Sequence, residues 1–153
     1  LYLQLETIKK QLLPILLSQF AGCIVGVISV DLIAKLMGAS YEIIYSLAPK
    51  SVTTPIAMEV TKSIGGIPAL TAAVVVCVGL LGGILGFKTM TLTHIGSPMA
   101  QGLSLGAAAH AVGTSTAMDI SSKYGAFASL GLTLNGIFTA LLTPTILRLL
   151  GLL

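Results

Sequence analysis

The chain has 153 residues, of which 55% are hydrophobic and only 8% are charged, and its mean hydropathy is +1.01. A water-soluble domain of this size has too little interior for so many apolar side chains, so the composition excludes a soluble protein and predicts a polytopic membrane protein. The formal net charge of +3 comes from scattered residues. Because Lys9 and Lys10 are the only basic cluster, nucleic acid is not an expected partner.

The first apolar run covers residues 12–30, which contain no charged side chain. Its length is close to the roughly 20 residues that a helix needs to cross the hydrocarbon of a bilayer. Gly22 and Gly26 have the small-xxx-small spacing that lets a second helix approach closely. Asp31 and Lys35 follow at i and i+4, so we expect an ion pair if the helix continues past them.

Residues 40–64 predict two short helices in place of one long one. Ser40 is a suitable N-cap for the first, and Pro49 ends it after too few residues to span a membrane. Thr54 and Pro55 provide the N-cap and first position of the second, which ends at Gly65. We therefore expect a discontinuous or re-entrant helix with extended backbone between its halves.

The remainder of the chain repeats this order. Residues 67–87 form a second uncharged span, and residues 88–98 form a polar linker. Residues 99–124 predict another broken helix, with non-helical backbone at residues 112–115 and an end at Gly125. Residues 126–150 form the last span, in which we expect Asn135 to make a hydrogen-bonding contact between helices.

A shift of 60 residues places residues 51–70 on residues 111–130. The identical pairs are Val52/Val112, Thr54/Thr114, Ala57/Ala117, Met58/Met118, Gly65/Gly125 and Leu70/Leu130. The sequence thus predicts an all-α fold: one transmembrane domain, residues 1–153, whose two discontinuous or re-entrant helices belong to an internal repeat of about 60 residues. The repeats cover about residues 40–87 and 99–150.

The topology of the repeats is left open by the positive charges. Hairpins that return to their own side make the two copies inverted, whereas broken helices that span make them parallel. Both arrangements place four Lys and Arg residues inside and three outside. We favour the inverted arrangement, because opposed breaks build one shared site.

Two long stretches carry a resemblance to a known family. They are P-K-S-V-T-T-P-I-A-M-E with the following G-G-I-P-A-L-T-A, and G-L-S-L-G-A-A-A-H-A-V-G-T-S-T-A-M-D. In these the chain resembles the LrgB/CidB family of bacterial membrane proteins, and the resemblance covers nearly all of its length. The family pattern usually has Glu at the position of Asp119, and its proteins are longer at the N-terminus, so we expect the opening helices of that pattern to be missing here.

The resemblance implies a multi-pass protein of the bacterial inner membrane with one of two functions. Bacterial members are antiholin-like partners of small holin-like proteins and regulate murein hydrolase activity, autolysis and programmed cell death. A similar plastid protein exports glycolate and glycerate, and other bacterial relatives are associated with pyruvate uptake. We favour the transporter of small monocarboxylates, with antiholin-like regulation as the alternative. The expected partners are a carboxylate anion, the lipid bilayer, a holin-like membrane protein and further copies of the chain.

The candidate site lies at the two breaks. Half-helices that start at membrane depth present free N–H groups and a partial positive charge to an anion. Around them we expect a substrate site made of hydroxyl, ammonium and imidazole groups: Lys50, Ser51, Thr53, Thr54, His110, Thr114, Ser115 and Thr116. His110, Glu59 and Asp119 are the candidates for proton coupling, since an imidazole or a partly desolvated carboxylate can titrate near physiological pH.

Each candidate also has a purely structural interpretation. Lys50 is then a side chain that extends to the membrane interface, and His110 is a packed residue bonded to a carbonyl. Glu59 and Asp119 then complement helix N-termini, and the hydroxyl groups are caps. Neither a nucleophile–base–orienter pattern nor metal-ligand spacing occurs, so we expect no enzyme activity, no cofactor and no metal.

Overall fold

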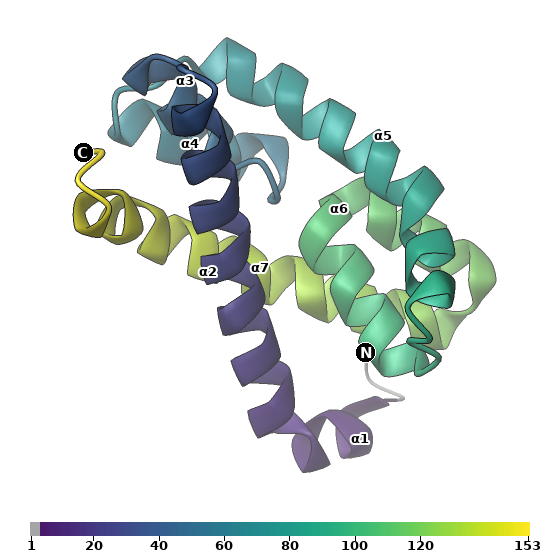
Figure 1. Ribbon diagram of the computed structural model, residues 1–153. Helices are drawn as coiled ribbons and strands as arrows, with labels where there is room; N and C mark the ends of the chain where they lie inside the picture. Colours follow the sequence, from purple (N-terminus) through teal and green to yellow (C-terminus); the bar gives the residue numbers. More distant parts are fainter. Residues whose placement is uncertain (1–3) are drawn as a thin grey trace.

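The computed structural model describes residues 4–153, and these residues contain α-helices and no strand (Figure 1). The all-α prediction is therefore confirmed. The described helices are α1 (Leu5–Lys10), α2 (Leu12–Leu36), α3 (Tyr41–Leu47), α4 (Thr54–Ser63), α5 (Pro68–Leu92), α6 (Pro98–Ile120) and α7 (Ser122–Leu149).

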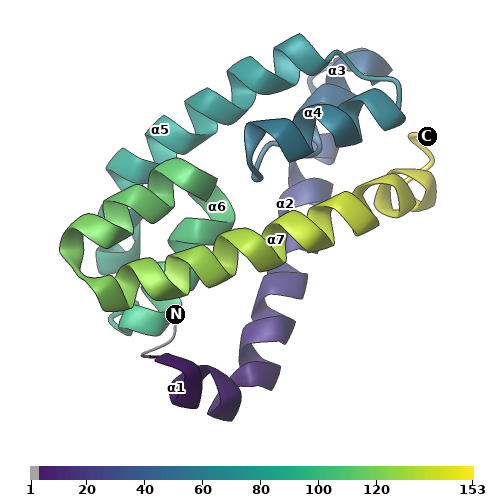
Figure 2. The same ribbon diagram turned by 180° about the vertical axis from the view of Figure 1, so that it is seen from behind.

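The helices pack around α6 and α7, which form the most extensive pair in the molecule. Helix α6 also packs against α5, while α2 crosses α7 (Figures 1 and 2). The short helices α3 and α4 lie beside the start of α5, close to the C-terminus (Figure 2). This arrangement brings the turn between α3 and α4 next to α2 and α6.

Three of the described helices, α2, α5 and α7, are long and apolar enough to cross a membrane. At 25 residues or more, each is about 38 Å long, which exceeds the roughly 30 Å of hydrocarbon in a bilayer. Large apolar side chains on these helices, such as Leu13, Ile84 and Leu141, are exposed. Exposed apolar faces of this kind suit contact with lipid.

Two of the expected spans are longer than the sequence indicated. Helix α2 continues to Leu36, so Asp31 and Lys35 both lie on it, but Asp31 is buried and Lys35 is exposed. The expected ion pair between them is therefore wrong. Helix α5 continues to Leu92, and the predicted linker at residues 88–98 is wrong over its first half. Threonine hydroxyls there donate to carbonyls of the preceding turn, which satisfies them within the helix.

The first predicted interruption is confirmed. Helix α3 ends at Leu47 and α4 begins at Thr54, with Thr53 as its N-cap. Gly65 then takes a φ of +82° after the end of α4, the left-handed conformation in which a residue without Cβ avoids strain.

The second predicted interruption is misplaced. Residues 112–115 are helical, and the non-helical backbone is a single residue, His110, with φ 41° and ψ −127°. The predicted end at Gly125 is also wrong, because Ser121 separates α6 from α7 and accepts a hydrogen bond from the Tyr124 N–H. The helical threonines near residue 112 bond to backbone carbonyls in place of breaking the helix.

Glycines let α6 and α7 touch through their backbones. A Cβ added to Gly106 would collide with the Ala128 carbonyl oxygen, and one added to Gly131 would collide with that of Leu103. No side chain separates the helices at these two points, as is typical of small-residue contacts between membrane helices.

Candidate functional site

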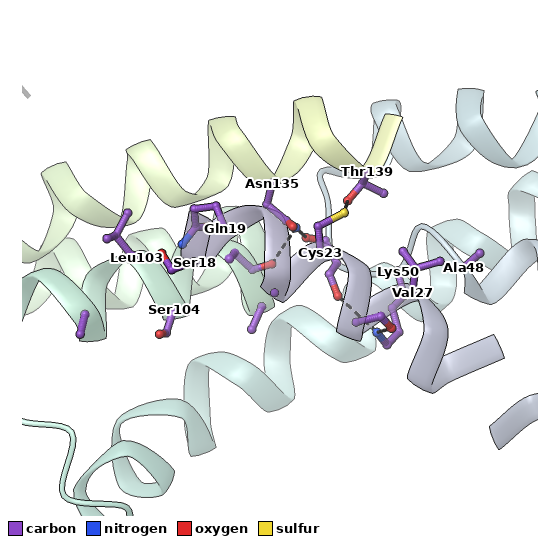
Figure 3. A pocket seen from close by; sticks show the side chains of 16 residues that line it. Ser18, Gln19, Cys23, Val27, Ala48, Lys50, Leu103, Ser104, Asn135 and Thr139 are labelled. Carbon is purple, nitrogen blue, oxygen red and sulfur yellow. Dashed lines mark hydrogen bonds between the residues drawn. The ribbon is translucent and has the colours of Figure 1, made fainter. Parts of the chain in front are cut away.

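A cavity of about 440 Å³ lies between α2, α6, α7 and the turn that joins α3 to α4 (Figure 3). This volume falls in the range of small-molecule sites, about 300–1,000 Å³. Helix α2 faces it with Gly22 and Gly26, where an added Cβ would meet no atom within 4 Å. Most other wall residues are small or apolar. The polar exceptions include Gln19, Lys50, Ser51, Ser104, Asn135 and Thr139.

Lys50 brings an ammonium group to this cavity from the turn after α3 (Figure 3). Its Nζ donates to the Gly26 carbonyl and to the Ser51 hydroxyl, both at 3.3 Å. An ammonium has three donors, so the described residues leave it one further bond to give. Burial lowers the pKa of Lys50 below its usual range, whereas the Asp31 carboxylate acts in the opposite direction.

Asn135 links three parts of the cavity wall. Its Nδ2 donates to the Ser51 carbonyl in the turn and to the Ala107 carbonyl on α6, both at 2.9 Å. The side chain starts from α7 and is 3% exposed. The predicted role as a helix–helix hydrogen-bonding contact is therefore confirmed, and the contact also fixes the backbone of the turn that carries Lys50.

A buried hydroxyl network holds the α3–α4 hairpin against α5. Thr61 and Thr71 share a hydrogen bond of 2.8 Å, and Thr71 also donates to the Ser46 carbonyl at 2.9 Å. The Ser46 hydroxyl accepts from the Ile67 N–H at 2.7 Å. Both threonines and Ser46 are fully buried. Because buried polar groups are costly when unpaired, this network favours one position of the hairpin and hence of Lys50.

The start of α4 carries two of the predicted binding residues. Thr53 is the N-cap but makes no side-chain capping bond, and Thr54 is the first helical residue. Both are half-buried, and neither lines the cavity. The structure thus brings Lys50 and Ser51 together at the cavity and places Thr53 and Thr54 beyond it.

His110 sits at the interruption of α6 and points at α5. Its Nε2 lies 2.9 Å from the Val75 carbonyl, an acceptor that requires the proton on this nitrogen. Gly79 makes room for the ring, because a Cβ there would lie 2.6 Å from His110 Cε1. Burial lowers the pKa of His110, and the bond to Val75 opposes this shift. A neutral imidazole clamped between two helices is the result.

The remaining hydroxyl candidates follow His110 along α6. Thr114 donates to the His110 carbonyl at 2.8 Å, and Thr116 donates to the Val112 carbonyl at 3.1 Å. Ser115 is exposed. These residues do not line the cavity beside Lys50, so the two predicted halves of the site lie at different places on α6.

The carboxylates divide by burial. Glu59 on α4 and Asp119 near the end of α6 are exposed, whereas Asp31 on α2 is fully buried. The sequence predicted that Asp31 would pair with Lys35, and not that it would be buried. Its spacing from Cys23 and Val27, at i−8 and i−4, places it on the buried face of α2. That spacing was the signal that could have identified it.

The structure is a helical bundle with three potential membrane spans, and an ammonium group lies in a cavity beside a broken helix. These features define a multi-pass membrane protein. The chain belongs to the LrgB-like family, which it matches over residues 1–149. Together these findings identify it as a multi-pass protein of the bacterial membrane.

Similar proteins extend this assignment. The chain is 38% identical over 149 residues to an uncharacterized protein of Haemophilus influenzae, covering 97% of this chain and 64% of that one. It is 40% identical over 147 residues to the uncharacterized protein YwbG of Bacillus subtilis, covering 96% and 65%. It is also 33% identical over 149 residues to the holin-like protein CidB of Staphylococcus aureus, covering 97% and 65%. The chain thus spans just under two thirds of these relatives, and no solved structure matches it.

Proposed function

We propose that the protein acts in the bacterial membrane as a holin-like protein of the CidB type, which regulates murein hydrolase activity and lysis together with a small holin-like partner. The support is the 33% identity to CidB over 97% of the chain. The test is expression of the full-length protein, with and without the partner, in a bacterium that lacks both genes. We expect the rate of lysis and the murein hydrolase activity to change. Unaltered lysis in every combination contradicts the proposal.

A second function, transport of a small monocarboxylate such as glycolate, glycerate or pyruvate, is favoured by the position of Lys50. Its ammonium faces a cavity of suitable size and has one donor left. A carboxylate bound there would gain a charge-assisted hydrogen bond. Ser51 and Asn135 provide polar groups in the same wall for the hydroxyl or keto oxygen next to the carboxylate.

A second hollow suggests how such an anion would move. It has a volume of about 520 Å³ and lies between α5 and α6. It shares Lys50, Ser51, Ser104 and Ala108 with the first cavity. Two hollows that share a cation in their walls support a path with a binding site at Lys50. In this proposal the two interrupted helices are the re-entrant elements of an inverted repeat, and His110 couples movement of α6 to α5.

Replacement of Lys50 separates the two functions. Uptake of labelled pyruvate, glycolate and glycerate is measured in liposomes that hold the full-length protein. We expect Lys50→Gln to raise the apparent substrate constant at least tenfold, and Lys50→Arg to restore it only in part, because a planar guanidinium differs from a point charge. Lys35→Gln, at an exposed lysine, is the matched control. If Lys50→Gln leaves uptake unchanged, Lys50 does not bind the anion; if it also leaves lysis unchanged, the lysis function is independent of the cavity.

A further inference from the structure

Asp31 is the one buried carboxylate among the five acidic residues of the chain. Its exposure is 0%, whereas Glu6, Glu42, Glu59 and Asp119 are exposed. Neither of its oxygens has a hydrogen-bond partner among the described residues. A buried ionised carboxylate without donors is costly, so a group that neutralises it is expected nearby.

Lys50 is the cation that bonds to the helix of Asp31. Its ammonium bonds to the carbonyl of Gly26, five residues before Asp31 on α2, which corresponds to an axial separation of about 7.5 Å. Two opposite charges in a low-dielectric interior attract each other over several ångströms.

Other titratable groups around Asp31 are less able to neutralise it. Cys23 lies on the same face of α2 and shares a hydrogen bond with Thr139. On α3, Glu42 is exposed, and the Tyr45 hydroxyl donates to the Leu152 carbonyl. On α7, Arg148 is exposed. Lys35 lies one turn after Asp31 on α2 but is exposed. Among the Lys and Arg residues that the structure describes, Lys50 alone is not exposed, so it is the cation available to balance Asp31.

We propose that Asp31 carries the proton that accompanies an anion bound at Lys50. In the empty site the ammonium and the Asp31 carboxylate balance each other. A bound monocarboxylate would leave one net negative charge, which a low-dielectric site disfavours. Transfer of a proton from water to the Asp31 carboxylate restores neutrality, and its return to water on the opposite side accompanies release of the anion.

This inference rests on the transport function proposed above and deepens it. Anion and proton then cross together without net charge, which avoids the roughly 2.3 kcal/mol per charge that a 100 mV potential imposes. The proton-carrying role moves from His110, Glu59 and Asp119, the candidates that the sequence favoured, to the buried Asp31.

The test uses full-length protein in liposomes and labelled pyruvate as the probe. Exchange of pyruvate is measured at equal pH on both sides, and net uptake is measured with and without an inward proton gradient. We expect the gradient to stimulate the parent protein at least fivefold. Asp31→Asn should retain exchange and lose the stimulation. Glu42→Gln, at an exposed carboxylate of α3, should keep both. Asp31→Leu, which has no polar group to satisfy, is the second variant should Asp31→Asn fold poorly.

The outcomes separate the two levels of the proposal. If the proton gradient still stimulates uptake by Asp31→Asn and Asp31→Leu, the role of Asp31 is wrong. The role is also wrong if Glu59→Gln loses the stimulation while Asp31→Asn keeps it. If the parent takes up none of the anions, the transport function is wrong. Infrared difference spectroscopy between about pH 5 and 8 then decides whether Asp31 binds a proton. The parent protein should show the carbonyl band of a protonated carboxylic acid, and Asp31→Asn should lack it. A band that persists in Asp31→Asn, or that is absent from the parent protein, refutes the proton site.

Discussion

Replacement of Asn135 by leucine should destabilise the protein by disconnecting three segments at once. Leucine has nearly the shape of asparagine, so the change removes the two hydrogen bonds to Ser51 and Ala107 without opening a large cavity. Polar contacts between membrane helices contribute about 0.6 kcal/mol on average and up to about 1.7 kcal/mol. Two bonds to carbonyls that would then lack a partner give an expected loss of between about 1 and 3 kcal/mol in the free energy of unfolding.

The measurement is unfolding in mixed micelles by titration with a denaturing detergent, followed by circular dichroism. Thr133→Val is the control, because Thr133 is exposed on the same helix and bonds only to the Ser129 carbonyl of its own helix. Its free energy of unfolding should change by less than about 0.5 kcal/mol. Equal stability of Asn135→Leu and Thr133→Val would refute the argument that Asn135 holds the turn of Lys50 to α6 and α7.

Three further predictions concern other contacts. Gly106→Ala places a methyl group against the Ala128 carbonyl and should cost about 1–3 kcal/mol, whereas Gly96→Ala, which meets open space, should be neutral in the same unfolding assay. Thr71→Val removes the bonds to Thr61 and to the Ser46 carbonyl and should lower the free energy of unfolding by about 1–3 kcal/mol. Thr89→Val, at an exposed position, is its control. Equal losses of stability in the two variants contradict the role of the hydroxyl network. The lowered pKa of His110 means that the unfolded chain binds a proton more readily, so stability should fall as pH decreases below about 6.5. In thermal unfolding scans, His110→Gln should lose less stability on acidification than the parent protein. If His110→Gln loses as much stability as the control His94→Gln, His110 is not the source of the pH dependence.

Much of the helical arrangement could be predicted because its signals are local. Uncharged runs of spanning length identified α2, α5 and α7, and Pro49 with Thr54 and Pro55 located the interruption between α3 and α4. Gly38, at φ +77°, follows the end of α2. These residues restrict the backbone through their own covalent structure, so no tertiary information was needed.

The second interruption could not be located in the same way. The threonines and glycine around residue 112 favour a break on propensity alone, yet the hydroxyls of Thr114 and Thr116 bond within the helix. The interruption occurs instead where His110 reaches the Val75 carbonyl across Gly79. That contact joins residues 35 positions apart, and its energy is not visible in a local pattern.

The candidate site was predicted only in part for a related reason. Lys50 and Ser51 line the cavity as expected of a central site. Asp31 was missed because its i, i+4 spacing predicted an ion pair with Lys35. Helices α3 and α7 pack against α2, and Asp31 is fully buried. The spacing from Cys23 and Val27 shows that Asp31 shares their face of α2, but whether that face is buried depends on elements that are distant in the sequence.

The backbone contact between α6 and α7 has a mechanical consequence. Sliding of one helix along the other would drive the Ala128 carbonyl into the backbone at Gly106, so the pair moves as one rigid body. Helix α2 faces the cavity with Gly22 and Gly26, where an added Cβ would meet no atom within 4 Å, so it lacks a close contact of this kind there. We therefore expect a change in the volume of the cavity to come from tilting of α2, or of the turn that bears Lys50, against the α6–α7 pair.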